Sequence, residues 1–428
     1  MNRVGHNFEI LVVGAGPAGI AAACAAAESG KHVGVVDTAS TPGGQIWLCA
    51  QTTKHDRQAS AWLRRFERCG GKLISRATVV AQLRPRELLV ETNEGALELG
   101  WQKLVLATGA RELFLPFPGW TLPNVLGAGG LQAQIKLGFP ISGKRVVVAG
   151  SGPLLLDVAD SLRQSGAEVC CIAEQASLWQ VMNFASHLLS HPGKLWQSLQ
   201  ILTRLVGVPY HTSCWPLRAE GLERVEAVSL TDGRKSWTEP CDYIACGFGL
   251  VPNIELPLLF GCALNGDVVQ VNDQQETSLP DVFCAGEPTG VGGVDCALVE
   301  GEIAGLTAAG RAVEATRLFG KRRRWHDFRR SLSTAFRLRE ELKTIAASDT
   351  VVCRCEDVSF GRLRQFSSWR EAKLQTRCGM GPCQGRICGV ATRTLFGWGV
   401  ESVRPPILPS RIETLVAADM KPRAESVQ

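Results

Sequence analysis

The strand–turn–helix–strand pattern of residues 8–37 constrains the fold of this chain more than any other feature of the sequence. The apolar run at 8–13 predicts a strand, and the Ala-rich stretch at 17–29 predicts a helix. Residues 32–36 predict a second strand, which ends on Asp37. This succession is one βαβ unit of an α/β fold.

Three glycines in the turn of this unit point to a dinucleotide site. Gly14 allows the tight turn, Gly16 lets the backbone approach a pyrophosphate, and Gly19 lets the helix pack closely against the strand. The N-terminus of the helix offers free N–H groups to the phosphates. Asp37, about twenty residues further on, is placed to accept hydrogen bonds from a ribose hydroxyl. The alternative is a glycine turn in an α/β fold that binds nothing.

A second, less regular unit begins at Lys144. Its first strand leads into a turn with Gly150 and Gly152, and its second strand ends on Glu174. Leu155 occupies the place of the third glycine, where a large side chain is expected to push the helix away from the strand. A carboxylate at Glu174 repels a 2′-phosphate, so that an occupant is expected to be NAD or an adenine nucleotide such as ATP. A vestigial, structural fold is the favoured interpretation.

Later segments place both units in a known order. Strand-and-turn patterns recur at 104–110 and 243–253, and DVFCAGEPTG lies at 281–290. This order resembles the flavoproteins of the thioredoxin reductase and glutathione reductase type, in which an inserted NAD domain splits the FAD domain. Glu287 stands where those proteins carry an aspartate that reaches the ribitol of FAD. The resemblance implies an FAD site made by Gly14, Gly16, Gly19, Asp37, Gly44, Gln45, Thr108, Gly109, Gly286 and Glu287.

Sixteen cysteines raise the question of disulfide chemistry. Eleven of them, from Cys24 to Cys296, are scattered through apolar stretches, where cysteine acts as a small apolar residue. The segment after Gly44 holds only Cys49, and the chain has no CxxC pair, so that a dithiol–disulfide mechanism is not expected. Because we find no signal peptide and no apolar run of membrane-spanning length, we expect a cytoplasmic protein with free thiols.

Five cysteines gather near the C-terminus. Cys353 and Cys355 form a CxC pair, and Cys378 and Cys383 form a CxxxxC pair about two dozen residues later. Four thiolates suit either zinc or a 2Fe–2S cluster, and spacing alone does not choose between them. Buried thiols without a metal are the third alternative. A flavin in the same chain favours the redox-active cluster, because a flavin takes up two electrons together and releases them singly.

This segment resembles the 2Fe–2S domain of bacterioferritin-associated ferredoxin, in which a CxC pair precedes a second close cysteine pair that leads into a helix. The resemblance implies Cys353, Cys355, Cys378 and Cys383 as the cluster ligands. Cys388, five residues after Cys383, is the alternate to Cys378, and it can equally serve as packing.

From residue 8 to about 410 the chain resembles the α-type subunits of heteromeric amine and amino-acid dehydrogenases. The group includes the A subunit of opine oxidase, the B subunit of cyanide synthase, and the proline and hydroxyproline dehydrogenase subunits. The motifs that carry the resemblance are ATGARELFLPFPGWTLPNV, GAGGLQAQIK, GKRVVVAGSGPLLLDVA and TRCGMGPCQGRICG. The implied α/β fold comprises a split FAD domain (1–113 and 250–310), an NAD-type Rossmann-like domain (114–249), a basic linker (311–350), a helical 2Fe–2S domain (351–400) and a C-terminal tail (401–428).

The same resemblance implies a partner. In this group a β subunit of the D-amino-acid-oxidase type contains FAD and removes hydride from the substrate, and the resemblance leaves open an FMN at a subunit interface and a small ferredoxin-like subunit. The favoured function is the electron-transfer subunit of a dehydrogenase acting on an amino or imino acid of the proline, hydroxyproline, opine or glycine type. The alternatives are a free-standing NADH:acceptor oxidoreductase and a non-catalytic iron–sulfur scaffold or sensor. No catalytic residue is assigned in this chain.

Charge is concentrated in one segment. Residues 311–345 carry a net +7, whereas the whole chain carries +5. A basic segment with neither an aromatic-rich sheet nor a recognition helix is not the pattern of a nucleic-acid-binding protein. We therefore expect a solvated or subunit-facing helix there.

Overall fold

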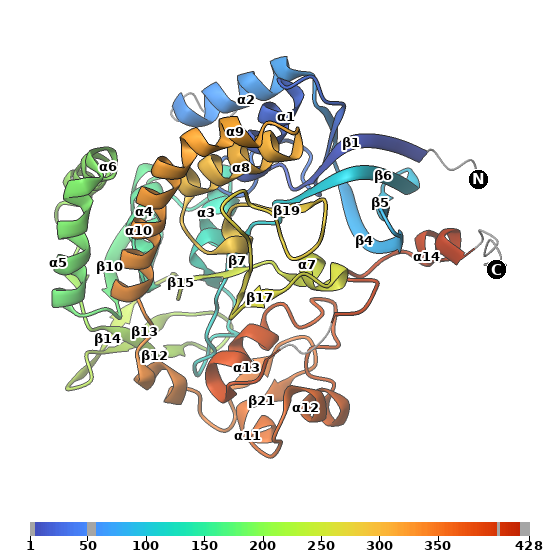
Figure 1. The fold of residues 1–428 in the computed structure, drawn as a ribbon. Helices are drawn as coiled ribbons and strands as arrows, with labels where there is room; N and C mark the ends of the chain where they lie inside the picture. Colours follow the sequence, from blue (N-terminus) through green and yellow to red (C-terminus); the bar gives the residue numbers. More distant parts are fainter. Residues whose placement is uncertain (1–4, 49–56, 400–402, 420–428) are drawn as a thin grey trace. The chain divides into compact units, whose positions relative to one another are not determined.

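The structure is a computed structural model that describes residues 5–48, 57–399 and 403–419 (Figure 1). The chain forms two compact units. Unit 1 comprises residues 1–110, 252–327 and 401–428, and unit 2 comprises residues 111–251 and 328–400. The chain passes between the units within a few residues of the boundaries expected at 113/114 and 249/250.

Unit 1 is built around a seven-stranded sheet. Its elements are β1 (Gly5–Val13), α1 (Pro17–Ala27), β2 (Val33–Val36), α2 (Arg57–Cys69), β3 (Lys72–Ile74), β4 (Ala77–Arg84), β5 (Glu87–Thr92), β6 (Gly95–Leu106), α7 (Glu255–Phe260), β17 (Leu264–Asn265), β18 (Val268–Val269), β19 (Val282–Cys284), η2 (Glu287–Thr289), α8 (Val294–Ala308), α9 (Ala312–Ala315), η3 (Thr316–Leu318) and α14 (Ile412–Asp419). The strand order is β3-β2-β1-β6-β5-β4, with β19 also paired to β6. The predicted first βαβ unit is confirmed as β1, α1 and β2.

The register of the parallel strands brings four loops to one edge of this sheet. Val13 pairs with Val36 of β2 and with Leu106 of β6, and Leu106 pairs with Cys284 of β19. All three pairings are parallel. The residues that follow these four positions therefore emerge together at the carboxyl edge, where open α/β sheets bind their ligands.

Helices α1 and α8 pack together through small residues. A Cβ added at Gly301 or Gly305 of α8 would lie less than 3.0 Å from the carbonyl oxygen of Ala18 or Ala22 of α1, respectively. Every residue of α1 from Ala18 to Ala26 is buried. The helix is apolar on all sides because the sheet and α8 enclose it.

Unit 2 contains a five-stranded parallel sheet of order β11-β10-β9-β15-β8 and an antiparallel sheet β12-β13-β14. Its elements are β8 (Val125–Gly127), α3 (Ala128–Lys136), β9 (Arg145–Gly150), α4 (Leu154–Gln164), β10 (Glu168–Glu174), α5 (Leu178–His187), η1 (Leu188–Ser190), α6 (Pro192–Arg204), β11 (Tyr210–His211), β12 (Trp215–Glu220), β13 (Ala227–Thr231), β14 (Ser236–Pro240), β15 (Tyr243–Gly247), η4 (Glu340–Thr344), β20 (Val351–Cys353), β21 (Val358–Ser359), α11 (Phe360–Leu363), α12 (Trp369–Thr376) and α13 (Cys388–Phe396). The predicted second βαβ unit is confirmed as β9, α4 and β10.

The cysteine-rich segment has a small core of its own within unit 2. The hairpin β20–β21 and helices α11, α12 and α13 enclose a cluster of buried apolar residues, and Trp369 packs against it. The segment is attached to the rest of the unit by a hydrogen bond of 2.5 Å from Trp120 Nε1 to the carbonyl oxygen of Val351.

The segment expected as a basic linker is largely helical. It contains α9, η3, α10 (Phe319–Ala335) and η4, and the boundary between the units at 327/328 falls within α10. β7 (Ala110–Glu112) and β16 (Leu250–Pro252) span two further boundaries, and the fourth, at 400/401, lies outside the described residues. Within unit 1 the buried Arg322 side chain binds both the carbonyl oxygen and the carboxylate of Asp273. Within unit 2 the rings of Phe328 and Phe336 lie 5.7 and 5.2 Å from that of Phe184. In the described part of the chain, no helix is long and apolar enough to cross a membrane.

Candidate functional site

The glycine turn after β1 is packed as tightly as its sequence predicts. Gly14 has a φ of +105°, and a Cβ there would lie less than 3.0 Å from the carbonyl oxygen of Ala107 in the loop after β6. A Cβ at Gly19 would lie less than 3.0 Å from the carbonyl oxygen of Gly14 and 3.3 Å from Val12 Cγ1. These two glycines therefore hold the turn against α1 and against a neighbouring loop.

Gly16 differs from these two glycines because the space in front of it is open. It is the N-cap of α1, in an extended conformation with φ −76° and ψ −176°, and no side chain caps the helix. Apart from the adjoining backbone, no heavy atom lies within 4 Å of the position of a Cβ at Gly16. The free N–H groups at the start of α1 therefore border an open space that suits a pyrophosphate.

A second loop borders this space. The N–H of Gly43 donates to the carbonyl oxygen of Ala15 at 2.8 Å, and a Cβ at Gly44 would lie 3.0 Å from Gly16 Cα. Gln45, predicted from the same loop, is exposed. Cys49 lies outside the described residues.

Asp37 points back toward the glycine turn. Its carboxylate accepts hydrogen bonds from the N–H of Ala15 at 2.5 Å and from the N–H of Ala39 at 2.7 Å. The acid at the end of β2 is thus fixed beside the turn in the position expected of a ribose acceptor.

The loop after β6 is fixed by Asn253. Thr108 Oγ1 donates to the carbonyl oxygen of Asn253 at 2.6 Å, and Asn253 Nδ2 donates to the carbonyl oxygen of Thr108 at 2.9 Å. The N–H of Asn253 also donates to the carbonyl oxygen of Gly109 at 3.0 Å. Thr108 and Gly109 therefore form a rigid part of the carboxyl edge. Asn253 was not predicted from the sequence.

The loop after β19 completes the arrangement. Gly286 has a φ of +79°, and a Cβ there would lie 2.8 Å from Ala18 Cβ of α1. The carboxylate of Glu287 accepts from the N–H groups of Gly292 and Gly293 at 3.1 and 3.0 Å, just before α8. Glu287, which is longer than the aspartate expected at this place, thus fixes the backbone at the start of α8. Gly286 lies next to the first turn of α1.

Sequence reasoning missed Glu300, a buried acid of α8. Its Oε2 accepts from the N–H of Gly286 and from Thr289 Oγ1, both at 2.9 Å. Its Oε1 lies 2.8 Å from His326 Nε2 and 3.5 Å from Cys296 Sγ. Glu300 therefore positions the loop that carries Glu287. The signal in the sequence is a pair of carboxylates, Glu300 and Glu302, within the otherwise apolar run CALVEGEIAG.

The second glycine turn has the same backbone design but a different environment. Gly150 has a φ of +144°, and a Cβ there would lie less than 3.0 Å from Gly247. The carboxylate of Glu174 accepts from the N–H groups of Gly152 and Ala176 at 2.7 and 2.8 Å. Glu174 is fully buried, and this burial raises its pKa to about 7 despite both hydrogen bonds.

Phe336 covers this second turn. Its Cγ lies 3.7 Å from the position of a Cβ at Gly152, and its carbonyl oxygen accepts from Ser151 Oγ at 3.2 Å. Gln175 holds the same segment, because its Nε2 donates to the carbonyl oxygen of Arg337 at 3.3 Å and its Oε1 accepts from the N–H of Arg339 at 3.1 Å. Within unit 2, the chain itself therefore lies where a pyrophosphate would approach.

Leu155 is accommodated by a glycine on the neighbouring strand. The side chain is fully buried, and Leu155 Cδ2 lies 3.7 Å from the position of a Cβ at Gly247 of β15. The absence of a side chain at Gly247 thus provides the space that Leu155 needs at the third glycine position of the turn.

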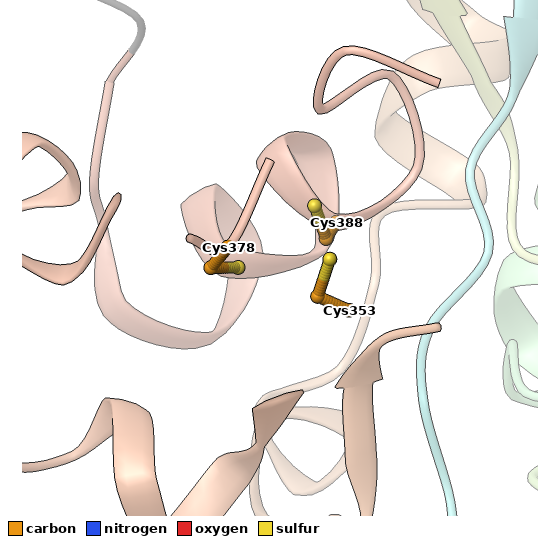
Figure 2. Close-up of side chains that lie close together, drawn as sticks. All are labelled: Cys353, Cys378 and Cys388. Carbon is orange, nitrogen blue, oxygen red and sulfur yellow. The ribbon is translucent and has the colours of Figure 1, made fainter. Parts of the chain in front are cut away.

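The cysteine segment brings three sulfur atoms together. The Sγ atoms of Cys353, Cys378 and Cys388 lie within 4.8 Å of one another, and all three side chains are buried (Figure 2). Cys353 comes from β20, Cys378 follows α12, and Cys388 begins α13. Hydrogen bonds from the Cys378 and Cys388 thiols hold the pKa of Cys353 far below its ordinary value. Cys353 therefore favours the thiolate, the form that binds metals, whereas the hydrogen bonds to Cys353 raise the pKa values of the Cys378 and Cys388 thiols.

Cys355 and Cys383 lie close together beside this group. Cys355 is exposed and Cys383 half-buried. A backbone hydrogen bond at Cys383 lowers the pKa of Cys355, but partial desolvation and the Cys383 thiol together raise it. A Cβ at Gly381 would lie less than 3.0 Å from Cys355 Cβ, so that a glycine is needed for the loop to pass. The structure thus brings Cys353 together with Cys378, and Cys355 with Cys383, and it adds Cys388 to the buried group.

The carboxyl edge of unit 1 and the two dinucleotide folds define a flavin-dependent oxidoreductase. The profile of the pyridine nucleotide-disulphide oxidoreductases matches residues 8–347, and the chain belongs to this family. The predicted flavoprotein fold is thereby confirmed.

Curated relatives extend over most of the chain. It is 31% identical to the HcnB subunit of hydrogen cyanide synthase from Pseudomonas aeruginosa, over 89% of this chain and 91% of the relative. It is 29% identical to the A subunit of opine oxidase from Rhizobium meliloti, over 94% and 97%. The predicted similarity to these subunits is therefore confirmed.

Solved structures show the same fold. L-proline dehydrogenase from P. horikoshii superimposes with a TM-score of 0.72 at 18% identity, over 97% of this chain and 80% of that one. Thioredoxin reductase of T. acidophilum gives a TM-score of 0.54 at 20% identity, over 72% of this chain and 99% of that one.

Proposed function

We propose that this chain is the electron-transfer subunit of a hetero-oligomeric dehydrogenase that oxidises an amino or imino acid on a partner subunit. The observation that carries the proposal is the gathering of the five C-terminal cysteines, three of them with Sγ atoms within 4.8 Å, in a chain whose other unit has an open flavin-type site. When bound, a flavin exchanges electrons in pairs or singly and a 2Fe–2S cluster exchanges them singly.

The residues of unit 1 fit FAD. The open space at Gly16 and the N-terminus of α1 would receive the pyrophosphate, and Asp37 would receive the ribose. Gly44, Gln45, Thr108, Gly109, Gly286 and Glu287 would line the remainder of the cofactor.

The cysteines fit a 2Fe–2S cluster by their donor chemistry. Four soft thiolates are the usual ligand set, and one buried sulfur already favours the thiolate form. We assign Cys353, Cys355 and Cys383 as ligands, with Cys378 as the fourth and Cys388 as its alternate. Zinc is the competing occupant, since it accepts the same ligands.

A free-standing NADH:acceptor oxidoreductase is the second candidate, and the second glycine turn argues against it. Phe336 lies over Gly152, and Gln175 holds the covering segment in place. The chain would have to move this segment before NAD or ATP could use the site.

The relatives named as subunits support a partner. We propose a FAD-containing β subunit of the D-amino-acid-oxidase type, while an FMN at the interface and a small ferredoxin-like subunit remain open additions. The substrate is expected to be proline, hydroxyproline, an opine or glycine, and the location cytoplasmic.

Anaerobic purification followed by cofactor analysis tests the proposal. We expect FAD, about two irons and about two acid-labile sulfides per chain. Untagged partner subunits that copurify are to be identified by mass spectrometry. Zinc in place of iron, or a chain without flavin, would contradict it.

A further inference from the structure

We propose that Cys296, Glu300 and His326 form a zinc site next to the loop of Gly286, separate from the C-terminal cysteines. Cys296 and Glu300 belong to α8 and His326 to the first half of α10, and all three lie in unit 1. The inference does not depend on the proposed function.

The three ligand atoms already lie close together. One atom each from Cys296, Glu300 and His326 is within 4.8 Å of the other two. Glu300 Oε1 lies 3.5 Å from Cys296 Sγ and 2.8 Å from His326 Nε2. A tetrahedral zinc ion with bonds of about 2.0–2.3 Å separates its ligand atoms by about 3.3–3.6 Å. The Glu300–Cys296 pair has this spacing, and the Glu300–His326 pair needs to open by about 0.5 Å.

The packing of two helices holds these side chains in place. Cys296 and Glu300 are four residues apart, so that both side chains project from one face of α8. Metal-binding pairs on a helix use the same spacing. The first half of α10 packs against α8, because Trp325 contacts the buried side chains of Val299 and Ile303. The third ligand is therefore brought to the pair by apolar contacts that need no metal.

The second carboxylate oxygen of Glu300 is fixed by hydrogen bonds. Glu300 Oε2 accepts from the N–H of Gly286 and from Thr289 Oγ1, both at 2.9 Å. Carboxylates that bind metals are typically oriented by such hydrogen bonds to their outer oxygen. The other oxygen, Oε1, is thereby turned toward Cys296 and His326.

The donor set matches zinc in type and in charge. Sulfur, imidazole nitrogen and carboxylate oxygen all bind zinc, and three protein ligands leave a fourth position for water. Mg²⁺ and Ca²⁺ prefer oxygen ligands throughout. Glu300 is fully buried, and a buried carboxylate is costly unless its charge is balanced. A thiolate at Cys296 and the carboxylate of Glu300 together balance the two charges of Zn²⁺.

An ion can reach the site from the side of His326. The His326 side chain is 29% exposed, whereas that of Glu300 is 1% exposed. Zinc binding replaces the proton of the Cys296 thiol, which passes to solvent. The imidazole binds as the neutral ring through Nε2, with its proton on Nδ1. Because the ion would join α8 to α10 through Glu300, it would also fix the loop that Glu300 holds at Gly286.

Zinc analysis of the intact chain tests the site. The protein is purified anaerobically with its cofactors and equilibrated with micromolar Zn²⁺, and its bound zinc is examined by X-ray absorption. We expect one zinc per chain with one sulfur ligand at about 2.3 Å and nitrogen and oxygen ligands at about 2.0–2.2 Å. Zinc at the C-terminal cysteines would have sulfur ligands instead.

Two ligand variants and one control locate the ion. Cys296→Ser and His326→Gln each remove a ligand, and glutamine at the half-buried position 326 can keep a hydrogen bond to Glu300. Glu302→Gln is the control, because Glu302 lies on the same helix but pairs with Arg65. Far-UV circular dichroism checks that each variant is folded.

Both ligand variants should bind this zinc at least about 100-fold more weakly, since loss of even a supporting partner of a ligand costs about 10–100-fold. Glu302→Gln should bind it as the wild type does. Iron and FAD contents should be the same in all four proteins.

Three results would overturn the inference and leave the proposed function untouched. A wild-type chain that binds no such zinc would reduce the three side chains to a hydrogen-bonded contact between α8 and α10. Equal zinc affinity in the wild type and both ligand variants, or a shell of sulfur alone, would place the ion elsewhere. A chain without iron and flavin that still loses one zinc in both ligand variants would instead contradict the proposed function and support this site.

Discussion

Replacing Gly16 with valine should separate flavin binding from folding. The backbone of Gly16, at φ −76° and ψ −176°, is one that valine adopts readily. Because no heavy atom apart from the adjoining backbone lies within 4 Å of the new Cβ, the side chain would project into open space. The folded chain should therefore accept the substitution, whereas the pyrophosphate of FAD should not.

The structure sets the size of both effects. An apolar N-cap in place of glycine costs up to about 1 kcal/mol. Valine also restricts the unfolded chain more than glycine does, which stabilises the folded state by about 0.4–1 kcal/mol. The free energy of unfolding should thus change by less than about 1 kcal/mol. Loss of two charged hydrogen bonds to the pyrophosphate, about 1.5–3 kcal/mol each, corresponds to roughly 100- to 20,000-fold weaker FAD binding.

Urea unfolding of the flavin-free protein and fluorescence titration with FAD measure the two quantities. Gly19→Ala is the matched comparison, because its Cβ would lie less than 3.0 Å from the carbonyl oxygen of Gly14. It should lower the free energy of unfolding by about 1–3 kcal/mol. Wild-type FAD affinity in Gly16→Val would refute the assignment of this site.

Three further outcomes follow from the cysteine cluster and the second glycine turn. Cys355→Ser and Cys378→Ser should each abolish the iron–sulfur absorbance, whereas Cys388→Ser should retain it. If Cys378→Ser retains the absorbance and Cys388→Ser abolishes it, Cys388 is the fourth ligand. Burial raises the pKa of Glu174 from the ordinary value of 4.5 to about 7 in the folded chain. This difference stabilises the folded state below about pH 4.5, and the stabilisation is lost as the pH rises to 7. Through this group the free energy of unfolding should fall by up to about 3 kcal/mol. In urea unfolding, Glu174→Gln should remove this part of the change in unfolding free energy with pH. If the free energy of unfolding of the variant varies with pH as it does in the wild type, the prediction is contradicted. NADH should leave the flavin oxidised because Phe336 covers the second turn, and rapid bleaching would contradict this.

The local pattern of the first βαβ unit was sufficient to predict its elements. Gly19 and Asp37 act through neighbours within one strand–helix–strand unit, whereas Gly14 packs against Ala107 in the loop after β6. The conformation of the motif can therefore largely be explained from residues that lie within the motif.

Contacts between distant segments could not be read from the sequence. Phe336 lies about two hundred residues beyond Gly152, and no periodicity links the two. Glu300 looks like an ordinary helix residue until the fold places it under Gly286. The same holds for Gly247, whose missing side chain makes room for Leu155. Such positions depend on packing across elements, which spacing does not encode.

The third cysteine of the buried group illustrates the same limit. Cys388 begins α13 and lies against Cys353 and Cys378. A sequence motif identifies ligand cysteines by their spacing along the chain, whereas a metal cluster requires sulfur atoms that lie close together in space. Spacing alone therefore could not place Cys388 beside Cys353 and Cys378.

Substrate-dependent dye reduction by the isolated chain and by the reconstituted complex tests the central claim most directly. Proline, hydroxyproline, glycine, sarcosine and opines would each be offered to the cofactor-loaded chain with and without its β subunit. The account predicts no turnover by the chain alone and turnover of at least one substrate by the complex. Robust turnover by the isolated, verified monomeric chain would contradict it.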